Sequence, residues 1–261
     1  MNQPFHLQVV NDDDPTQHAV LTDNPAQQIV EFDGFYMPDS TLLSVNAYNY
    51  DGAIYQDSIL NPRGMTLTIY FTSKSFFDSV KHAYQLLFAS GTTVRIGYGT
   101  NNNTYFRWIN AVVESVSLPR FNQPRKAYLA MQINLVAFNP LWVSGSKVIQ
   151  QAFTNTFTIN YDGSYPAPFA VTISNGATIT DPVIHCNGET LSLNLSTTQK
   201  IMVDTGNKKI EVGNANYITA WVHGSKWLKL KHGTNTITFS ATVSATRATK
   251  ITYEECYLGA I

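Results

Sequence analysis

The hydrophobic residues of this chain follow two different spacings. Over most of its length they alternate with polar residues in short runs separated by glycine, proline, asparagine and aspartate, a pattern typical of β-strands joined by turns. The clearest run spans residues 63–72, where Met65, Leu67, Ile69 and Phe71 occupy every second position. Side chains of a strand point alternately to its two faces. The pattern therefore predicts a strand that buries these four side chains.

One segment has the spacing of an α-helix instead. Within residues 73–90 the apolar side chains recur at intervals of three and four positions, which gathers them on one face of a helix. Ser73 or Ser75 can cap its first turn, and Gly91 suits its end. The stripe predicted to face the core consists of Phe76, Val80, Ala83 and Leu87, widened by Phe77, Tyr84 and Leu86.

The alternating pattern returns after the helix, in residues 92–98 and 105–117, with an asparagine-rich tract between the two runs. Two strand-like runs joined in this way predict a long β-hairpin. We expect the hairpin to reach a neighbouring subunit of an oligomer. The residues predicted to make that contact are Asn101, Asn102 and Asn103 at the tip, and Arg107 and Trp108 beyond it.

The composition changes after Trp142 to serine, threonine, glycine and glutamine, which predicts a boundary near residue 145 and two domains, 1–145 and 146–261. From residue 169 onward, about eight short strand-like runs follow one another without a helical period, as in a β-sandwich or jelly roll. The expected fold is therefore mainly β. It has an N-terminal β-sandwich-like domain with one α-helix and the long hairpin, followed by a C-terminal β-sandwich.

Composition narrows the classes of function. The chain has 44% hydrophobic but only 13% charged residues, against about 25% charged in an average domain. A net charge of -1 provides no long-range field to attract nucleic acid or an anionic membrane. The sequence also has no secretory signal pattern and no apolar run long enough for a membrane span. We expect a soluble, non-exported protein without membrane or specific nucleic-acid binding.

The residues that usually carry catalysis or bind metals are not arranged for either. Cys186 and Cys256 lack a CxxC pattern or nearby histidines, so buried free thiols are favoured over a metal site, and a disulfide stays open. We interpret the acidic run 12–14 as a solvated segment rather than as a calcium-binding loop. Glu254 and Glu255 are consecutive, so in a strand they face opposite sides and cannot easily flank one glycosidic bond. We expect no enzyme activity, cofactor or metal.

An aromatic group near the C-terminus allows two interpretations. Trp221 and Trp227 lie close to His223 and His232 in the sequence. The more ordinary interpretation places the tryptophans in a sandwich core and the histidines at strand ends. The alternative is a groove in which Trp221, Trp227 and Tyr217 stack on sugar rings, and the C-terminal half would then be a carbohydrate-binding module.

Five short motifs follow one another over residues 171–239. In order, they read Val171-Thr172-Ile173, Ile179-Thr180-Asp181-Pro182-Val183-Ile184, Met202-Val203-Asp204-Thr205-Gly206-Asn207-Lys208-Lys209, Ser225-Lys226-Trp227-Leu228-Lys229-Leu230 and Gly233-Thr234-Asn235-Thr236-Ile237-Thr238-Phe239. This series resembles the C-terminal domain of siphophage distal tail proteins. The N-terminal half resembles the same family through the strand that begins at Arg63, the single helix after it, and Pro140-Leu141-Trp142. Residues 137–139 depart from the family pattern, since many relatives have a cysteine there.

This resemblance implies a structural virion protein at the tip of a long, non-contractile phage tail. The N-terminal domain would form a hexameric ring that lets DNA pass, and the C-terminal domain would be a galectin-like β-sandwich. Expected partners are the major tail tube protein, a tail-associated lysin or tape-measure-linked tip protein, and receptor-binding or baseplate proteins. Assembly would take place in the host cytoplasm. The alternatives are a module that attaches to host cell-wall glycans and a β-sandwich glycosidase using Glu254 or Glu255.

Overall fold

The computed structural model divides the chain into two compact units, Met1–Val143 with Leu258–Ile261, and Ser144–Tyr257. The expected second domain, 146–261, included the last four residues, whereas the structure places them in the first unit. There the Ala260 amide donates to the carbonyl of Phe35 at 2.9 Å. Within the described residues, no helix has the length and apolar character to cross a membrane. The structure describes residues 5–22, 25–46, 53–100, 106–117, 129–152, 156–243 and 247–260.

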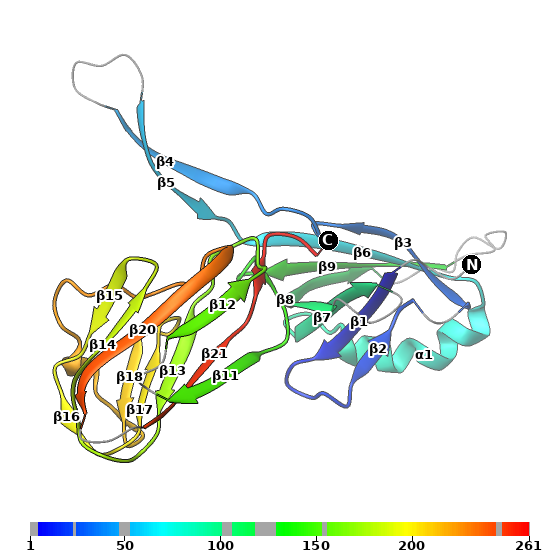
Figure 1. The fold of residues 1–261 in the computed structure, drawn as a ribbon. Coiled ribbons are helices and arrows are strands. Elements are labelled where there is room, and N and C mark those ends of the chain that lie inside the picture. The colour runs from blue at the N-terminus through cyan, green and yellow to red at the C-terminus, as the bar shows by residue number, and fades with distance from the viewer. Residues whose placement is uncertain are drawn as a thin grey trace. The chain divides into compact units, whose positions relative to one another are not determined.

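The first unit is built on one antiparallel sheet whose strands lie in the order β2-β1-β7-β8-β9-β6-β3, with β10 paired to β8 (Figure 1). The alternation predicted for residues 63–72 is confirmed, since the four apolar side chains of this strand are at most 2% exposed. The strands are β1 (Phe5–Asn11), β2 (His18–Val20), β3 (Gln27–Asp33), β6 (Arg63–Phe71), β7 (Thr93–Thr100), β8 (Phe106–Ser117), β9 (Leu129–Ala137) and β10 (Trp142–Val143).

The predicted helix is present as α1 (Lys74–Leu87), and the hydroxyl of Ser73 accepts a hydrogen bond from the amide of Phe76 at 3.4 Å. Its buried face is rotated from the predicted one: Phe77, Tyr84 and Leu87 are buried, whereas Ala83 is exposed. The sheet selects this face. Phe77 packs edge-on against a phenylalanine of β6, and the Tyr84 hydroxyl donates to Gln27 at 2.6 Å.

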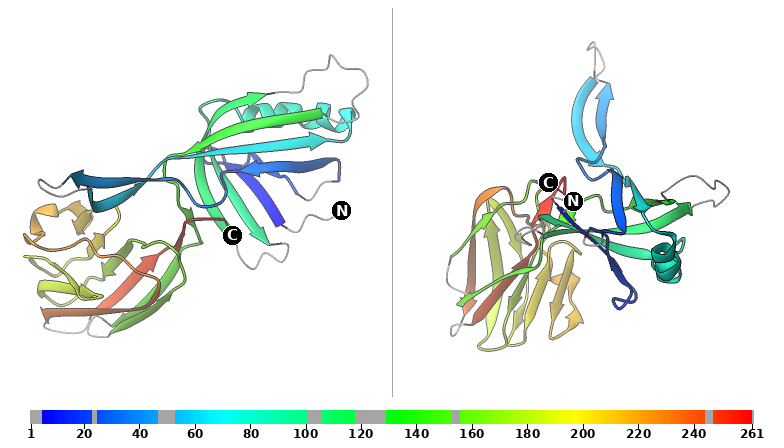
Figure 2. Two further views of the ribbon diagram at one scale, coloured as in Figure 1. Left: turned by 90° about the horizontal axis from the view of Figure 1, so that it is seen from above. Right: turned by 90° about the vertical axis from the view of Figure 1, so that its right-hand side faces the viewer.

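A separate two-stranded hairpin, β4 (Ser40–Asn46) and β5 (Ala53–Leu60), pairs with no other strand of the described chain. Figures 1 and 2 show it extending away from the sheet of the first unit. The hairpin predicted across residues 92–117 is confirmed, since β7 and β8 pair antiparallel with each other, but both strands lie inside the main sheet between β1 and β9. The strands that protrude are therefore earlier in the sequence than expected.

The second unit contains two antiparallel sheets, one ordered β11-β21-β13-β17-β18-β19 and the other β12-β20-β14-β15, with β16 paired to β14. Val171, Val203 and Ile251 in the first sheet and Phe157 and Ile237 in the second are fully buried, so the predicted β-sandwich is confirmed. The elements are β11 (Lys147–Ala152), β12 (Phe157–Tyr161), β13 (Phe169–Ile173), β14 (Ile179–Cys186), β15 (Glu189–Ser192), β16 (Ser196–Thr197), β17 (Ile201–Asp204), β18 (Lys209–Val212), β19 (Ala215–Asn216), a 3-10 turn η1 (Ile218–Ala220), β20 (Gly233–Val243), β21 (Ala248–Tyr253) and β22 (Cys256–Tyr257).

Candidate functional site

Two of the predicted aromatic residues meet in a pocket of the second unit. The pocket has a volume of about 300 Å³ and is lined by Lys208, Ile218, Trp221 and Trp227. The two indole planes are within 10° of parallel, with ring centroids 6.4 Å apart. Both tryptophans are only partly buried, so the interpretation that they fill the sandwich core is wrong. The fully buried tryptophan is Trp142, in the first unit.

The segment that carries these tryptophans is held firmly to the sandwich. Ala220 and Leu228, each next to one of the tryptophans, are 2% and 0% exposed. Backbone hydrogen bonds join Val222 to Ser192 at 3.1 Å and Lys226 to Thr190 at 2.8 Å, so the segment runs along the edge of β15. The two rings are therefore positioned before any ligand arrives.

The charged side chain that lines the pocket is that of Lys208. The Trp221 Nε1 atom is buried and has no hydrogen-bond partner among the described residues. Lys208, in a turn with φ of 53°, forms no ion pair within the described part of the chain. Tyr217 is 46% exposed and lies beside the pocket in sequence, but it does not line it. Of the three residues predicted to stack on sugar rings, Trp221 and Trp227 therefore line the pocket and Tyr217 does not.

The predicted inter-subunit residues fall in two groups. Asn101, Asn102 and Asn103 lie outside the described residues. Arg107 donates to the carbonyl of Gly259 at 2.9 Å, and the ring of Trp108 lies under the guanidinium of Arg95 at 4.8 Å. Arg107 and Trp108 thus have partners within their own unit, and their contact with another subunit stays a prediction.

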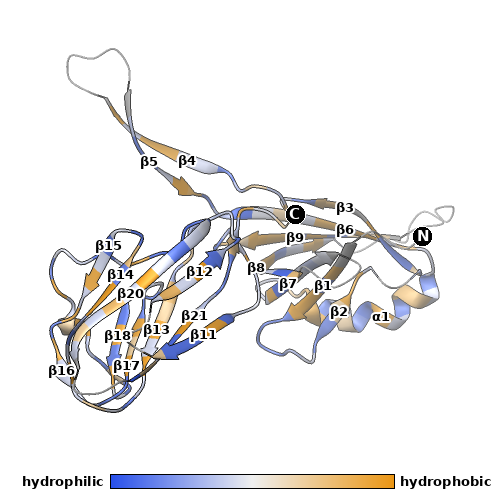
Figure 3. Cartoon of the chain, viewed as in Figure 1, coloured by the Kyte–Doolittle hydropathy of each residue, from blue (hydrophilic) through white to orange (hydrophobic). Residues whose placement is uncertain are grey.

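The sequence reasoning did not single out the β4–β5 hairpin, which carries many exposed large apolar side chains. Consecutive strand residues point to opposite faces, so exposed Leu42 and Leu43 show that both faces of the ribbon are partly apolar, and Figure 3 shows apolar positions on both strands. A two-stranded ribbon in water is only marginally stable alone. The sequence does carry a signal for this hairpin. Apolar residues are adjacent in it, as in Leu42-Leu43, whereas a strand with one buried face alternates apolar and polar residues. The exposed fractions are 67% for Leu42, 38% for Leu43, 48% for Val45, 61% for Tyr55 and 55% for Ile59.

A buried arginine holds the base of this hairpin. Arg63, the first residue of β6, is 4% exposed and donates to four backbone carbonyls. Burial lowers the pKa of its guanidinium to about 10, so it remains a cation at neutral pH. Two acceptors precede the hairpin and two come from distant segments, so we call this group the carbonyl clasp. Its carbonyls belong to Gly34 (3.0 Å), Tyr36, Pro140 (2.7 Å) and Leu258 (2.6 Å).

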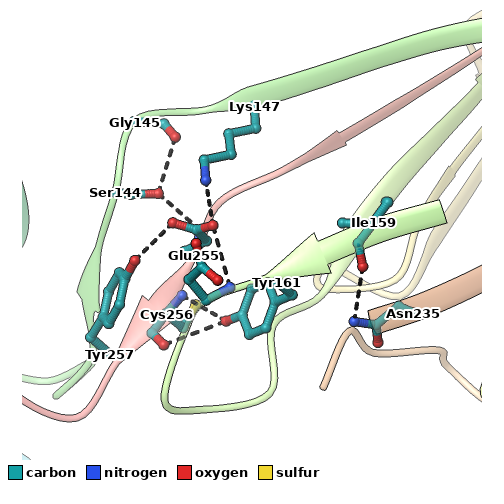
Figure 4. A network of polar contacts seen from close by, with 10 residues as sticks. Ser144, Gly145, Lys147, Ile159, Tyr161, Asn235, Glu255, Cys256 and Tyr257 are labelled. Carbon is teal, nitrogen blue, oxygen red and sulfur yellow. Dashed lines mark hydrogen bonds and ion pairs between the residues drawn. The ribbon is translucent and has the colours of Figure 1, made fainter. Parts of the chain in front are cut away.

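The carboxylates considered for glycoside hydrolysis do not form a pair. Glu255 is 4% exposed and forms an ion pair with Lys147, and its carboxylate accepts a hydrogen bond from the Tyr257 hydroxyl at 2.7 Å (Figure 4). Its amide donates to Ser144 Oγ at 3.0 Å. Glu254 is exposed. The negative charge of Glu255 is therefore balanced by Lys147, and the residue has a structural role in the second unit. The glycosidase interpretation then lacks the pair of carboxylates that it requires.

Replacing Glu255 with glutamine is expected to lower the free energy of unfolding of the second unit by about 1–3 kcal/mol at neutral pH. Burial by itself would raise the pKa of Glu255, but hydrogen bonds from Lys147 and Tyr257 and the charge of Lys147 outweigh burial, so the pKa lies below its usual value. The carboxylate therefore contributes stability above its unfolded pKa of about 4.3, and the contribution is lost as pH falls through the lower folded pKa.

Urea denaturation of the full chain at several pH values checks this expectation, with Glu254→Gln as the exposed matched control. The Glu255 variant and the wild type should become similar in stability as the pH falls through the lowered folded pKa of Glu255. A deficit that is unchanged by acid would mean that the carboxylate charge has no role.

Other candidate chemistry has structural explanations. Cys186 and Cys256 are free, buried thiols, and desolvation raises the pKa of each to about 11. The acidic run ends in a tight turn, where Asp14 accepts hydrogen bonds from Thr16 and Gln17. Across the described ranges, histidine, cysteine, aspartate and glutamate nowhere form a group of three that could hold a metal ion.

Comparison with known proteins shows which family part of the chain resembles and which fold the whole chain shares. Residues 162–257 match the siphovirus-type tail component family, C-terminal domain. The fold is similar to that of the crystal structure of phage SPP1 Dit, described as a hub of the adsorption apparatus in phages that infect Gram-positive bacteria. That match has a TM-score of 0.70 at 15% identity and covers 96% of this chain and 98% of SPP1 Dit.

A weaker likeness is to a chain of the phage p2 baseplate in its activated conformation with calcium. It has a TM-score of 0.45 at 7% identity and covers 95% of this chain and 98% of that one, and it supports no inference. No curated protein matches the sequence. Residues 162–257 are therefore similar to the siphovirus-type tail component family, C-terminal domain, and over nearly its whole length the chain has a fold similar to that of SPP1 Dit.

Proposed function

We propose that this protein is the hub at the tip of a long, non-contractile phage tail, where it joins the tail tube to the baseplate or host-adhesion device. The observation that carries the proposal is the fold, since the likeness to SPP1 Dit covers both units of the chain at once. The family match of residues 162–257 supports it independently from sequence. The protein acts as a structural component, and the proposal contains no catalytic step.

The β4–β5 hairpin supports assembly with further copies of the chain. Fully burying one large apolar side chain contributes roughly 1.5–3 kcal/mol, and this hairpin exposes five that are at least 38% accessible. Because they lie on both faces, a partner on one side would leave the other face in water. A position between neighbouring subunits would cover both, and repeated head-to-tail contacts of this kind close into a ring when the rotation permits.

Finer features of the proposal come from the family resemblance. The ring contains six copies and encloses a channel for DNA. One side contacts the major tail tube protein, and the other carries a tail-associated lysin or tape-measure-linked tip protein together with receptor-binding or baseplate proteins. The protein assembles in the host cytoplasm and remains at the virion tail tip. Residues 101–103, with Arg107 and Trp108, are a second proposed contact between subunits.

The double variant Leu42→Asp/Ile59→Asp is expected to abolish the ring. Each aspartate would place a charge in a surface that the assembly removes from water, whereas in the free monomer both positions are solvated, so the monomer should still fold. Light scattering over a range of concentrations and negative-stain images provide the measurement, because assembly depends on mass action. A hexamer would have about 174 kDa, six times the 29.0 kDa of one chain.

The matched control is Leu86→Asp/Val148→Asp, which makes equivalent changes at exposed positions outside the hairpin, 48% and 52% accessible. Its ring should persist. A wild-type protein that stays monomeric at high concentration would contradict the hub proposal itself. A ring unaffected by the hairpin variant would contradict only the role of β4 and β5, and loss of the ring on deleting residues 101–103 would then favour the second contact.

A further inference from the structure

We propose that the pocket formed by Lys208, Ile218, Trp221 and Trp227 binds an acidic pyranose residue of a surface polysaccharide. The proposal goes beyond the hub function and does not depend on it, because the pocket lies wholly within the second unit. We refer to these four residues as the tryptophan pocket.

The shape of the tryptophan pocket suits one sugar ring. Its volume of about 300 Å³ lies at the lower end of the range of about 300–1,000 Å³ found for small-molecule sites. The faces of indole rings carry negative partial charge and attract the weakly positive C–H groups of a ring laid against them. Two near-parallel indoles offer such faces, and the exposed Ile218 adds further apolar surface.

The charged group of the pocket specifies what the ring must carry. Lys208 adds a positive charge for which no carboxylate is in ion-pair range within the described part of the chain. A ligand that fits both this charge and the indole faces must bring a negative charge and an apolar C–H face. A hexuronic acid has both.

The same features argue against a segment of another protein as the occupant. A strand or helix needs an extended groove, whereas four residues line this pocket. An aliphatic or aromatic side chain would fill the apolar space but would leave the Lys208 charge without a partner. An acidic polysaccharide can instead seat one ring in the pocket and place the next against the exposed Tyr217 and Val222.

The test uses the full chain with two defined probes, trigalacturonic acid and the neutral maltotriose, and follows binding by calorimetry and by saturation-transfer NMR. We expect trigalacturonic acid to bind more tightly than maltotriose. Trp227→Ala should weaken binding of trigalacturonic acid about tenfold or more, and Trp227→Phe, which keeps an aromatic face, should retain most of it. Lys208→Gln should weaken trigalacturonic acid several-fold and leave maltotriose unchanged.

Trp108→Phe, in the first unit, is the matched control and should leave binding of both probes unaltered. Three results would overturn the proposal: neither sugar binding at millimolar concentration, equal binding by wild type and Trp227→Ala, or binding of the uncharged apolar dye Nile red in this pocket with no binding of either sugar. The last result would assign the pocket to an apolar partner. Thermal unfolding of each variant shows whether it is folded. Light scattering of the same variants measures the mass of the ring, so that a loss of sugar binding is distinguished from a failure of the hub assembly.

Discussion

Replacing Arg63 with methionine is expected to lower the free energy of unfolding of the first unit by about 3–5 kcal/mol. Methionine fills much of the same volume but donates no hydrogen bond. Four carbonyls of the carbonyl clasp would then lose their donor, in a place where Arg63 is only 4% exposed and water cannot readily replace it. Lysine would not restore the group, because one ammonium lacks the planar fork of the guanidinium.

Denaturation of the full chain with guanidinium chloride measures the loss of stability. Hydrogen exchange, measured on peptides from β6 and from β13, reports on the first and the second unit separately. Exchange should accelerate in β6 and stay unchanged in β13. The matched control is Arg95→Met, which removes an arginine whose guanidinium lies over Trp108 and should cost about 0.5–1 kcal/mol. A loss below about 1 kcal/mol for the Arg63 variant would show that the clasp is not a major support of the unit.

Replacing Gly34 with alanine is expected to destabilise the first unit by about 2–4 kcal/mol, from two causes that add. Gly34 has a φ of 76°, a conformation that residues with a Cβ rarely adopt. An added Cβ would also overlap the Gly64 carbonyl oxygen and come within 3.0 Å of Met65 Cα. Both obstacles are backbone atoms of β6, so they cannot move aside as a flexible side chain would.

Gly91→Ala separates the two causes, because Gly91 has a φ of 86° but nothing within 4 Å of the position of its Cβ. That variant should lose only the conformational part, about 1 kcal/mol. The same denaturation and exchange measurements apply. Equal losses for the two glycines would mean that the close approach of Gly34 to β6 contributes nothing.

Both changes act on the base of the β4–β5 hairpin. The Gly34 carbonyl is one acceptor of Arg63, and Arg63 begins β6 shortly after the hairpin ends at Leu60. The clasp therefore ties together the chain entering and leaving the hairpin. Under the proposed function, loosening it should weaken ring assembly even in molecules that remain folded.

Much of the fold followed from local sequence. The alternation of residues 63–72 identified β6 and its buried face, because a strand side chain's direction depends only on its position in the strand. The three-four spacing identified α1 in the same way, and Ser73, one of the two serines named as possible caps, is the residue that caps it. The change of composition after Trp142 predicted a boundary near residue 145, and the main segment of the first unit ends at Val143. The free state of the two thiols also agrees with the sequence interpretation.

Contacts between residues far apart in the chain decided the rest. Periodicity allowed several faces for α1, and contact with β6 and Gln27 selected one. Nothing in the local sequence distinguishes Arg63 and Arg247 from ordinary surface arginines. In the folded chain each is buried and donates to four carbonyls, Arg63 within the first unit and Arg247 within the other. Those acceptors exist only once separate segments of backbone have come together.

The tryptophan pocket and the β4–β5 hairpin also depend on contacts that local sequence does not specify. The sequence named Trp221 and Trp227, but only the folded second unit sets their rings nearly parallel beside Lys208. Local pattern predicted the hairpin over residues 92–117, and strand pairing then placed it inside the main sheet and left β4 and β5 without a third strand among the described residues. Side-chain spacing is fixed by neighbours in the chain, so the sequence by itself determined the elements. Which edges and faces remain open depends on how distant strands pair, and only the tertiary structure decided that.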